Sequence, residues 1–371
     1  MGVSMRTVVI GGGILGAIAA YSLLRAGVEV VLIDRADEGR ATQAGAGIIS
    51  PWTTLHEGAA LYAMLEGGAV AYPDLVAALA EDGQSDLGYA RIGTLCAPED
   101  PAVLAAVERL VRSRALACPL AGAVSILEPA EAQRLFPAMA RRRALYLSGG
   151  ARVDGRRLCR ALHQAIARRG GTIRVGAASL LMQGDRLLGA AAGGDAIVAD
   201  AVILAGGAWA PAVLAPLGLQ LAIEPQRGQI VHLRLEGTDT AAWPVLYPMT
   251  SHYLLTFEEG RVVIGATRET GSGFDRRVTA AGIATVLATA LTVAPGLAHA
   301  TYLETRIGFR PMSPDGCPML GTVPGLPNLV IANGLGPSGL TISPFAGQIA
   351  AGLAMGTPPP LDLAPYDPLR R

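Results

Sequence analysis

Four residues near the start of the chain have the types and the spacing that dinucleotide binding requires. Gly11, Gly13 and Gly16 form a G-x-G-x-x-G motif, and Asp34 lies 18 positions after Gly16. In such a motif the first glycine permits a tight turn, the second lets the backbone approach a pyrophosphate, and the third lets a helix pack closely on a strand. The carboxylate can accept a hydrogen bond from a ribose hydroxyl. These residues predict a bound dinucleotide; a glycine-rich turn without a ligand is the alternative.

Two strands and a helix must hold these residues in place. Residues 8–10 (VVI) and 28–34 (VEVVLID) are rich in β-branched side chains, as buried parallel strands are. Apolar residues at helical spacing occupy 15–24, and Gly27 ends that helix. Its N-terminus carries the partial positive charge that favours a phosphate. Because the glycines interrupt the uncharged run at 7–24, we do not interpret this run as a signal peptide.

Two later segments indicate which dinucleotide is bound. A buried strand at 201–204 runs into Ala205, Gly206 and Trp209, where a strand beside the motif would reach the cofactor crevice. A strand and glycine-rich turn at 328–341 lead into a helix of small residues from Ser343 to Met355. The N-terminus of that helix could stabilise negative charge near N1 and the C2 oxygen of a reduced flavin. We therefore favour FAD over NAD.

The composition excludes several other classes of protein. Thirty acidic residues balance thirty basic ones, so the chain has no excess of positive charge that would favour binding to a nucleic acid or an anionic membrane. All of the basic residues are arginine, so the lysine of a phosphate-binding loop or of a Schiff-base enzyme is missing. The four cysteines and five histidines show no metal-ligand spacing. We expect no metal, no disulfide framework, no transmembrane segment and a cytoplasmic location, with attachment to the inner membrane as the alternative.

With these motifs, the chain resembles the D-amino-acid oxidase superfamily of FAD oxidoreductases, and within it the glycine oxidases and the bacterial D-amino-acid dehydrogenases. The resemblance covers nearly the whole chain. Beyond the N-terminal motif it rests on four segments: 40–51 (RATQAGAGIISP), 205–209 (AGGAW), 225–229 (PQRGQ) and 308–321 (GFRPMSPDGCPMLG). The last of these is the most specific.

The resemblance implies an α/β fold in which a Rossmann-like FAD-binding domain is interleaved with an α+β substrate domain that contains an antiparallel sheet. Residues 1–80, 148–222 and 304–371 are assigned to the FAD-binding domain, and residues 81–147 and 223–303 to the substrate domain. The sequence agrees with this organisation, because residues 253–265 have the pattern of a β-hairpin. Residues 101–142 instead show helical periodicity with little strand signal.

The resemblance also implies which residues contact the cofactor. Non-covalent FAD is expected, because the segment 44–47 contains no histidine and Cys317 lies beyond Asp315. Val175, at the end of an expected strand at 172–175, would meet the adenine through its backbone. The full set of expected cofactor contacts is Gly11, Gly13, Ile14, Leu15, Gly16, Asp34, Arg35, Thr42, Gln43, Gly47, Ile48, Ile49, Val175, Ala205, Gly206, Trp209, Gly336, Pro337, Ser338, Gly339, Leu340 and Thr341.

The implied substrate contacts are clamps rather than catalytic groups, because the flavin itself accepts the hydride. Arg310 matches the carboxylate-binding arginine of the superfamily, and a guanidinium fork suits a carboxylate; pairing with Asp315 is the alternative. Tyr253 matches a substrate-binding tyrosine of glycine oxidases, with a ring buried in the core as the alternative. Tyr302 and His252 are weaker candidates for the pocket wall.

The resemblance therefore implies FAD-dependent oxidative deamination of a small amino acid, with a D-amino acid as the first candidate. Hydride transfer from Cα to flavin N5 would give an imine, which water hydrolyses to a keto acid and ammonia. Pro337 replaces an arginine that glycine oxidases use, which argues against glycine itself.

Three alternatives stay open: a glycine- or sarcosine-type amine oxidase, a flavin 2-hydroxy-acid dehydrogenase, and the flavoprotein subunit of a heteromeric amine dehydrogenase. The electron acceptor is a quinone or O2. The absence of a lysine, which some sarcosine-oxidising relatives use to activate oxygen, favours the quinone. The chain could act as a homo-oligomer or with a partner subunit.

Overall fold

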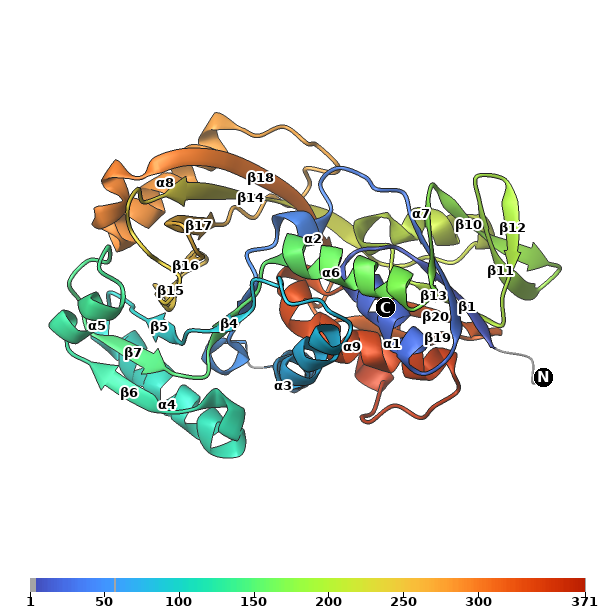
Figure 1. The fold of residues 1–371 in the computed structure, drawn as a ribbon, viewed down its shortest axis with the longest axis horizontal. Helices are drawn as coiled ribbons and strands as arrows, with labels where there is room; N and C mark the ends of the chain where they lie inside the picture. Colours follow the sequence, from blue (N-terminus) through green and yellow to red (C-terminus); the bar gives the residue numbers. More distant parts are fainter. Residues whose placement is uncertain (1–4, 57, 371) are drawn as a thin grey trace.

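The computed structural model describes residues 5–56 and 58–370 of the chain. Figure 1 shows two regions side by side, each built on a sheet, with both ends of the chain in the same region. One sheet is six-stranded and mainly parallel, and the other is eight-stranded and mainly antiparallel. The expected mixed α/β architecture is confirmed.

The six-stranded sheet has the order β19-β20-β13-β1-β2-β9. All neighbouring strands run parallel except β19 and β20, which are antiparallel. The expected strands before and after the glycine motif, at 172–175 and at 201–204, are all present. The bounds are β1 Arg6–Ile10, β2 Glu29–Asp34, β9 Thr172–Val175, β13 Ala201–Leu204, β19 Met319–Val323 and β20 Leu326–Asn333.

The two faces of this sheet pack against different secondary-structure elements. Val9 and Leu32 belong to a core shared with helices, whereas Val8 and Val31 pack with Leu187 and other side chains of a small sheet. Because side chains alternate between the faces of a strand, both faces are apolar and both must be covered. The small sheet consists of β10 Ala178–Gln183, β11 Arg186–Ala192 and β12 Asp195–Val198, and the sequence analysis did not predict it.

Four helices cover the other face, as Figure 1 shows around α1 and α9. They are α1 Ile14–Arg25, α3 Ala59–Glu81, α6 Gly155–Arg168 and α9 Gly339–Ala354. Glycines allow close helix contacts, since a Cβ on Gly347 would lie 2.7 Å from Ile18 and one on Gly68 would lie 2.0 Å from the Thr341 carbonyl oxygen. Helix α9 begins at Gly339, four residues before the Ser343 at which we expected it to start.

The eight-stranded sheet has the order β18-β14-β17-β16-β15-β5-β7-β6. The expected hairpin is present as β16 and β17. The stretch at 101–142 contains the expected helical structure in α4 Pro101–Ala117 and α5 Pro129–Leu135, and its strand structure is the short β6 at the sheet edge. The bounds are β5 Thr94–Cys96, β6 Val124–Leu127, β7 Ala144–Leu147, β14 Glu224–Arg234, β15 Val245–Tyr247, β16 Tyr253–Thr256, β17 Arg261–Gly265 and β18 Thr301–Met312.

Side chains alternate between the two faces of each strand of this sheet, so only one face carries the side chains that point towards the other region. Leu254 and Ile264 pack with helix α8 (Ala280–Val293). Leu255 and Val263 point to the opposite face, where the core also includes Tyr253. The face that carries Tyr253 is therefore the one turned towards the glycine-rich segments of the other region.

Two long paired strands, β14 and β18, connect the two regions. Strand β18 crosses the boundary that we expected between residues 303 and 304, so the proposed domain limits stay a prediction. Three short strands form a further sheet nearby: β3 Ile48–Ile49, β4 Ala90–Arg91 and β8 Ala151–Arg152. The remaining helices are α2 Ala41–Ala44 and α7 Ala210–Leu214.

Within the described part of the chain, α3 alone is long and apolar enough, by length and composition, to cross a membrane. It has 23 residues and contains Pro73. Its buried residues, among them Met64, Leu65 and Tyr72, pack into the same core as α9. A core helix meets the same length and composition test, so α3 is weak support for a membrane span.

Candidate active site

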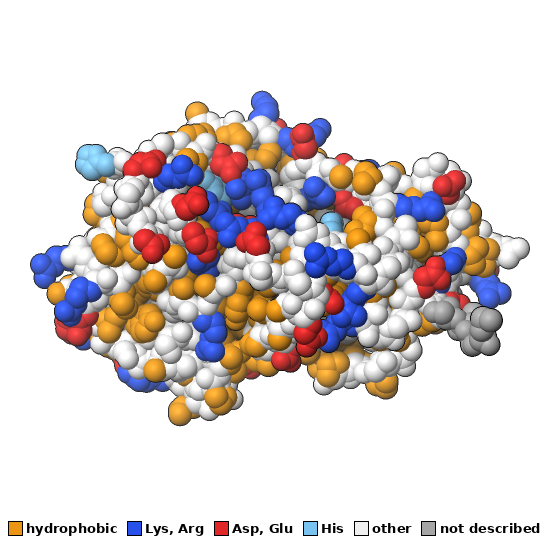
Figure 2. Space-filling model, viewed as in Figure 1, with side chains coloured by type: hydrophobic (Ala, Val, Ile, Leu, Met, Phe, Trp, Pro, Cys, Tyr) orange, Lys and Arg blue, Asp and Glu red, His pale blue; other side chains and the backbone are white. Residues whose placement is uncertain are grey.

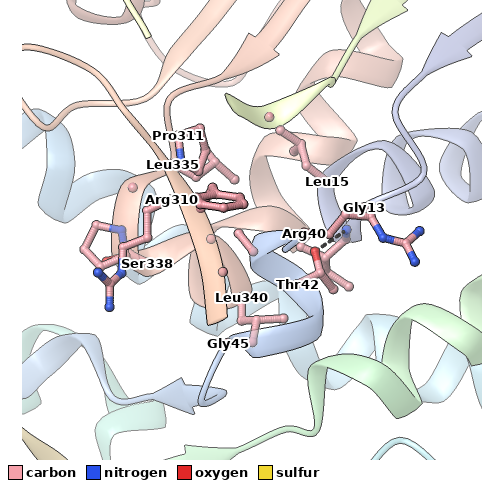
Figure 3. Close-up of a pocket in the computed structure, with 18 of the residues that line it drawn as sticks. Gly13, Leu15, Arg40, Thr42, Gly45, Arg310, Pro311, Leu335, Ser338 and Leu340 are labelled. Carbon is pink, nitrogen blue, oxygen red and sulfur yellow. Dashed lines mark hydrogen bonds between the residues drawn. The ribbon is translucent and has the colours of Figure 1, made fainter. Parts of the chain in front are cut away.

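A large cavity of about 640 Å³ lies where the two regions meet. Ile10 and Ala205, at the ends of the parallel strands, line one end, and Tyr253 and Arg310 of the eight-stranded sheet line the other. Figure 3 shows Arg40 and Arg310 on opposite sides of this space, with Leu15, Thr42 and Leu340 between them. The cavity therefore has a nucleotide end and a second end formed by the antiparallel sheet.

The turn between β1 and α1 is built as a dinucleotide site requires. Gly11 has a φ of 108°, and a Cβ there would lie 2.3 Å from the carbonyl oxygen of Ala205. The Ile14 amide donates to Thr42 Oγ1 at 3.0 Å. Helix α1 has no acidic residue in its first turn and no side-chain cap from Gly13. The positive end of the helix thus faces the cavity without a carboxylate that would compete with a pyrophosphate.

The carboxylate of Asp34 is fixed at the end of β2. Its Oδ2 accepts a hydrogen bond from the Gly12 amide at 2.6 Å, and its Oδ1 accepts from the Ala36 amide at 2.7 Å and from Arg40 at 3.1 Å. Asp34 and Arg35 both line the cavity, as expected. A fixed acceptor at this place fits the ribose of a dinucleotide.

The turn before α9 forms the central part of the wall. The Leu340 carbonyl oxygen accepts a hydrogen bond from Tyr72, and Thr341 Oγ1 donates to the Ile48 carbonyl oxygen at 2.8 Å. Asn333 donates to the Gly207 carbonyl oxygen at 2.9 Å, which joins this turn to the end of β13. Helix α9 also has no acidic residue in its first turn. The geometry fits a flavin whose negative charge, when reduced, would lie near this helix N-terminus.

Most of the expected cofactor residues line this one cavity, although they come from five separate segments. They are Gly11, Gly13, Ile14, Leu15, Asp34, Arg35, Thr42, Gly47, Ile48, Ala205, Gly206, Trp209, Gly336, Pro337, Ser338, Gly339, Leu340 and Thr341. None of the cavity-lining residues in the described part of the chain is a cysteine. Non-covalent attachment of FAD stays a prediction.

Four expected cofactor residues do not line the cavity. A Cβ on Gly16 would lie 1.9 Å from the Gly11 carbonyl oxygen, so Gly16 allows close packing, as its place in the motif implied. The Gln43 carbonyl oxygen accepts from Arg156 at 2.9 Å, and Ile49 is buried. Val175 is 79% exposed, and residues 176–178 line the cavity beside it. Contacts of these four residues with the cofactor stay predictions.

Arg310 lies at the second end of the cavity, on β18. Its Nη1 donates to Gln226 Oε1 at 3.1 Å and to the Thr267 carbonyl oxygen at 3.0 Å. The alternative partner, Asp315, instead pairs with Arg370 at 2.8 Å. No carboxylate of residues 5–56 or 58–370 lies within ion-pair distance of Arg310. The guanidinium is therefore held in place while its charge has no partner.

The backbone of β14 makes room for this guanidinium. Gln226 lies opposite Arg310 in the β14–β18 register, and a Cβ on Gly228 would lie 2.5 Å from Arg310 Nη2. Burial lowers the pKa of Arg310, and the charge of nearby Arg268 acts in the same direction. A guanidinium nevertheless stays protonated in proteins. Arg310 is thus a desolvated cation in the cavity wall.

Tyr253 lines the cavity near Arg310. Burial raises the pKa of its phenol, although the charges of Arg310 and Arg268 oppose that shift. A neutral phenol can donate a hydrogen bond to a carboxylate. The expected role of Tyr253 in substrate binding thus stays a prediction that its position supports.

The two weaker candidates lie elsewhere. Tyr302 is 49% exposed, and its hydroxyl donates to Thr305 at 3.0 Å. His252 Nδ1 lies 3.1 Å from Ser251 Oγ. Neither residue lines the cavity, so the prediction that they do was wrong.

Several further residues at this end of the cavity carry no motif and were not predicted from the sequence: Tyr247, Met249, Thr250, Ser251 and Arg268. Arg268 follows β17 by three residues. The turn of the predicted hairpin was the one signal available, since it brings the end of β17 back beside Tyr253.

Comparison with known proteins identifies the fold and its chemistry. A family model described as FAD dependent oxidoreductase (DAO) matches residues 6–353. The chain is 44% identical to the uncharacterized oxidoreductase YurR of Bacillus subtilis over 97% of this chain and 98% of that protein. It is 32% identical to the glycine oxidase of Pseudomonas aeruginosa over 99% of this chain and 100% of that protein.

Among solved structures, the iminodiacetate oxidase IdaA of Chelativorans sp. BNC1 superimposes with a TM-score of 0.95 at 46% identity, covering 98% of this chain and 99% of that one. The glycine oxidase of Geobacillus kaustophilus has a TM-score of 0.86 at 25% identity, with 99% and 100% of the two chains covered. The family model, the relatives and the cavity agree, and the chain belongs to the FAD dependent oxidoreductase family as an enzyme that uses FAD to oxidise C–N bonds of amino acids or related amines.

Proposed function

We infer that this enzyme oxidises a small amine at the carbon next to a carboxylate, and that Arg310 binds this carboxylate. One observation carries the inference: the guanidinium of Arg310 lies in the cavity wall, held by two hydrogen bonds, with no acidic partner among the described residues. A desolvated and unpaired cation is costly unless a ligand supplies the counter-charge. A substrate carboxylate, which an arginine fork can bind bidentately, is such a ligand.

The residues at this end of the cavity bind and orient rather than transfer protons. When bound, FAD accepts the hydride from the carbon between the amine and the carboxylate, and the imine product reacts with water. Arg310 fixes one end of the substrate, and the Tyr253 hydroxyl can donate a second hydrogen bond to the same carboxylate. Fixing the reacting carbon in this way lowers the entropic part of the barrier.

The comparisons favour one substrate class over our first candidate. The relatives most similar to the chain include proteins named iminodiacetate oxidase and glycine oxidase, and in those compounds the oxidised carbon belongs to an unbranched carboxymethyl group. The proposal is therefore an amine that carries a carboxymethyl group, ahead of a D-amino acid with a side chain on its α-carbon. Pro337 lines the cavity at the position where the resemblance implies an arginine in glycine oxidases, and this difference argues against glycine itself.

The first test is anaerobic bleaching of the visible absorbance of the purified holoenzyme. The panel contains iminodiacetate, N-methylglycine, glycine, D- and L-alanine and 2-hydroxy acids. We expect the carboxymethyl amines to bleach the flavin, with release of ammonia or a primary amine and of glyoxylate. Bleaching by 2-hydroxy acids alone would overturn the proposal, and a flavin that no compound reduces would indicate an enzyme that depends on a partner subunit.

The electron acceptor is tested with the same reduced enzyme. Reoxidation by air with production of hydrogen peroxide would identify an oxidase. Reoxidation by a soluble quinone but not by air would identify a dehydrogenase, which the absence of lysine favours.

A further inference from the structure

The charged residues that line the cavity divide into two groups. Arg35 and Arg40, at the nucleotide end, pair with Asp37 at 2.6 Å and with Asp34 at 3.1 Å. Those two aspartates are the acidic residues among the described lining residues. The nucleotide end is thus internally neutralised.

The substrate end contains two arginines and no acid. Arg268 and Arg310 both line it, and neither has an ion-pair partner in the part of the chain that the structure describes. The acid next in sequence to Arg268 is already engaged, because Glu269 accepts from Arg227 Nε at 2.8 Å and from Gln229 at 2.7 Å. The cationic charge at this end therefore exceeds what one carboxylate can balance.

The two arginines are also structurally linked. The backbone carbonyl oxygen of Thr267, the residue before Arg268, accepts the hydrogen bond from Arg310 Nη1 at 3.0 Å. Arg310 is half-buried, whereas Arg268 is exposed, and both line the same cavity. The charge of Arg268 acts on Arg310, Tyr253 and Tyr247, which places it beside the residues that surround the substrate.

Two like charges at one end of a cavity repel each other unless a ligand separates them. A ligand with one carboxylate would neutralise Arg310 and leave Arg268 unpaired. A ligand with a second carboxylate on the other side of its amine would satisfy both guanidinium groups, one at the buried end and one at the opening.

We propose that Arg268 is a specificity-determining residue that binds the second carboxylate of a small dicarboxylic amine, while Arg310 binds the carboxylate next to the oxidised carbon. The inference rests on the proposed function and deepens it, because it separates an enzyme for amines of the iminodiacetate type from one for N-methylglycine or glycine.

The test compares two substrates in four holoenzymes. Iminodiacetate and N-methylglycine share one carboxymethyl amine and differ in the second carboxylate. We measure kcat/KM for both with the wild type, Arg268→Gln, Arg268→Lys and the control Arg186→Gln, which removes an exposed arginine outside the cavity. A charge-assisted hydrogen bond contributes about 1.5–3 kcal/mol, so we expect Arg268→Gln to lower the iminodiacetate preference about 10- to 100-fold.

The effect should appear in KM for iminodiacetate more than in kcat, and Arg268→Lys should recover part of it. An equal loss for both substrates, or an unchanged preference, would overturn the role of Arg268. If the wild type oxidises N-methylglycine and glycine but not iminodiacetate, the proposed function survives and the second-carboxylate site fails.

A binding measurement keeps the two hypotheses separate when no substrate is turned over. Oxydiacetate replaces the amine of iminodiacetate by an ether oxygen, and methoxyacetate does the same for N-methylglycine. Titration of the holoenzyme should give a lower Kd for oxydiacetate, and Arg268→Gln should remove most of this difference. Equal Kd values for both ethers in the wild type would contradict the proposal whatever the enzyme oxidises.

Discussion

Whether a charged residue serves structure or binding depends on its partners. Arg227 and Arg310 lie on neighbouring strands, yet Arg227 donates to Glu269 at 2.8 Å, whereas Arg310 contacts an amide and a backbone carbonyl. The charge of Arg227 is paired with a carboxylate of the protein, whereas the charge of Arg310 can pair with a carboxylate of a ligand. The sequence shows only that both residues are arginines. Their contacts in the folded protein show that one has an acidic partner and the other does not.

Replacing Arg310 by alanine should abolish carboxylate binding while FAD stays bound. We expect kcat/KM for the amine substrate to fall by about 30-fold to several thousand-fold, because truncating one partner of a buried charge pair costs about 2–5 kcal/mol. Steady-state kinetics and the flavin absorbance of the purified variant measure the two effects. Unchanged kinetics would remove Arg310 from the substrate site.

Replacing Tyr253 by phenylalanine removes the hydroxyl and keeps the ring. We expect a rise in KM of about tenfold with little change in FAD content, in line with the loss of one hydrogen bond to a charged group. If the ring alone matters, Tyr253→Phe will have wild-type kinetics, and the tyrosine is then a packing residue of β16.

At the scale of secondary structure, glycines set where a ligand or a side chain can approach the backbone. Gly11 permits the turn that brings β1 close to the end of β13, and Gly228 gives the guanidinium of Arg310 its place over β14. The first glycine belongs to a recognisable motif. The second lies in the segment 225–229 that carried the family resemblance, and its contact with Arg310 depends on the pairing of β14 with β18.

Gly228→Ala should therefore impair substrate binding by displacing the guanidinium of Arg310. The added Cβ would lie 2.5 Å from Arg310 Nη2, so the guanidinium must move away from Gln226 and Thr267. We expect an increase in KM of about tenfold and normal FAD content, measured by kinetics and absorbance. Gly352→Ala is the matched control, because its Cβ would meet Thr357 at 3.7 Å, an ordinary contact. Equal kinetics for both variants would contradict this positioning role.

Asp34→Ala should weaken FAD binding. The substitution removes the carboxylate that accepts hydrogen bonds from the Gly12 amide and from Arg40. It also removes the expected hydrogen bond to the ribose. We expect the purified variant to lose FAD on dialysis, with a Kd raised about tenfold or more, measured by titration of the apoprotein. Full flavin occupancy after dialysis would count against the ribose contact.

At the scale of the whole molecule, paired strands join the two regions, and polar groups are buried where they meet. Figure 2 shows acidic and basic side chains intermixed on the face that covers α6, β14 and β18. Ion pairs there include Arg261 with Asp154 at 2.7 Å and Arg157 with Glu258 at 3.3 Å. Beneath them His232 is 2% exposed, and neither of its ring nitrogens has a hydrogen-bond partner among the described residues.

This buried histidine should make the fold sensitive to acid. Burial lowers the pKa of His232 to about 3, and the charge of Arg306 adds to the shift. Below the ordinary pKa of about 6.5, the unfolded chain binds a proton that the folded chain does not. The contribution to stability is thus complete above pH 6.5 and is lost as the pH falls towards 3, by roughly 2 kcal/mol at about pH 5.

His232→Gln should reduce this loss. We expect the Tm of the holoenzyme to fall less between about pH 7.5 and pH 5 in His232→Gln than in the wild type. His299→Gln removes an exposed histidine and serves as the control. An equal fall in all three proteins would show that His232 does not determine the acid sensitivity.

Local signals in the sequence were enough for the strand–helix–strand unit that carries the glycine motif. The glycines, the β-branched runs and Asp34 act over a few tens of consecutive residues, because a strand, a turn and a helix are specified by their own residues. The same holds for the hairpin of β16 and β17. The resemblance to a family, carried by longer motifs, supported the choice of FAD over NAD and added the interleaved fold and the role of Arg310.

Tertiary structure decided the rest. The sheet β10–β12 has a local hairpin signal in its two-residue turns, 184–185 and 193–194, which was overlooked, but its place over one face of the six-stranded sheet depends on distant segments. Strand β6 likewise extends a sheet made by distant segments. Tyr302 and His252 have suitable side chains for a site but lie outside the cavity, because the tertiary arrangement of β16 and β18 decides which residues reach its wall. The two unpaired arginines at the substrate end meet because residues near 226, 253, 267 and 310 come together in one sheet. Whether their charges are paired depends on which acids lie nearby in space, and no local pattern of residues contains that information.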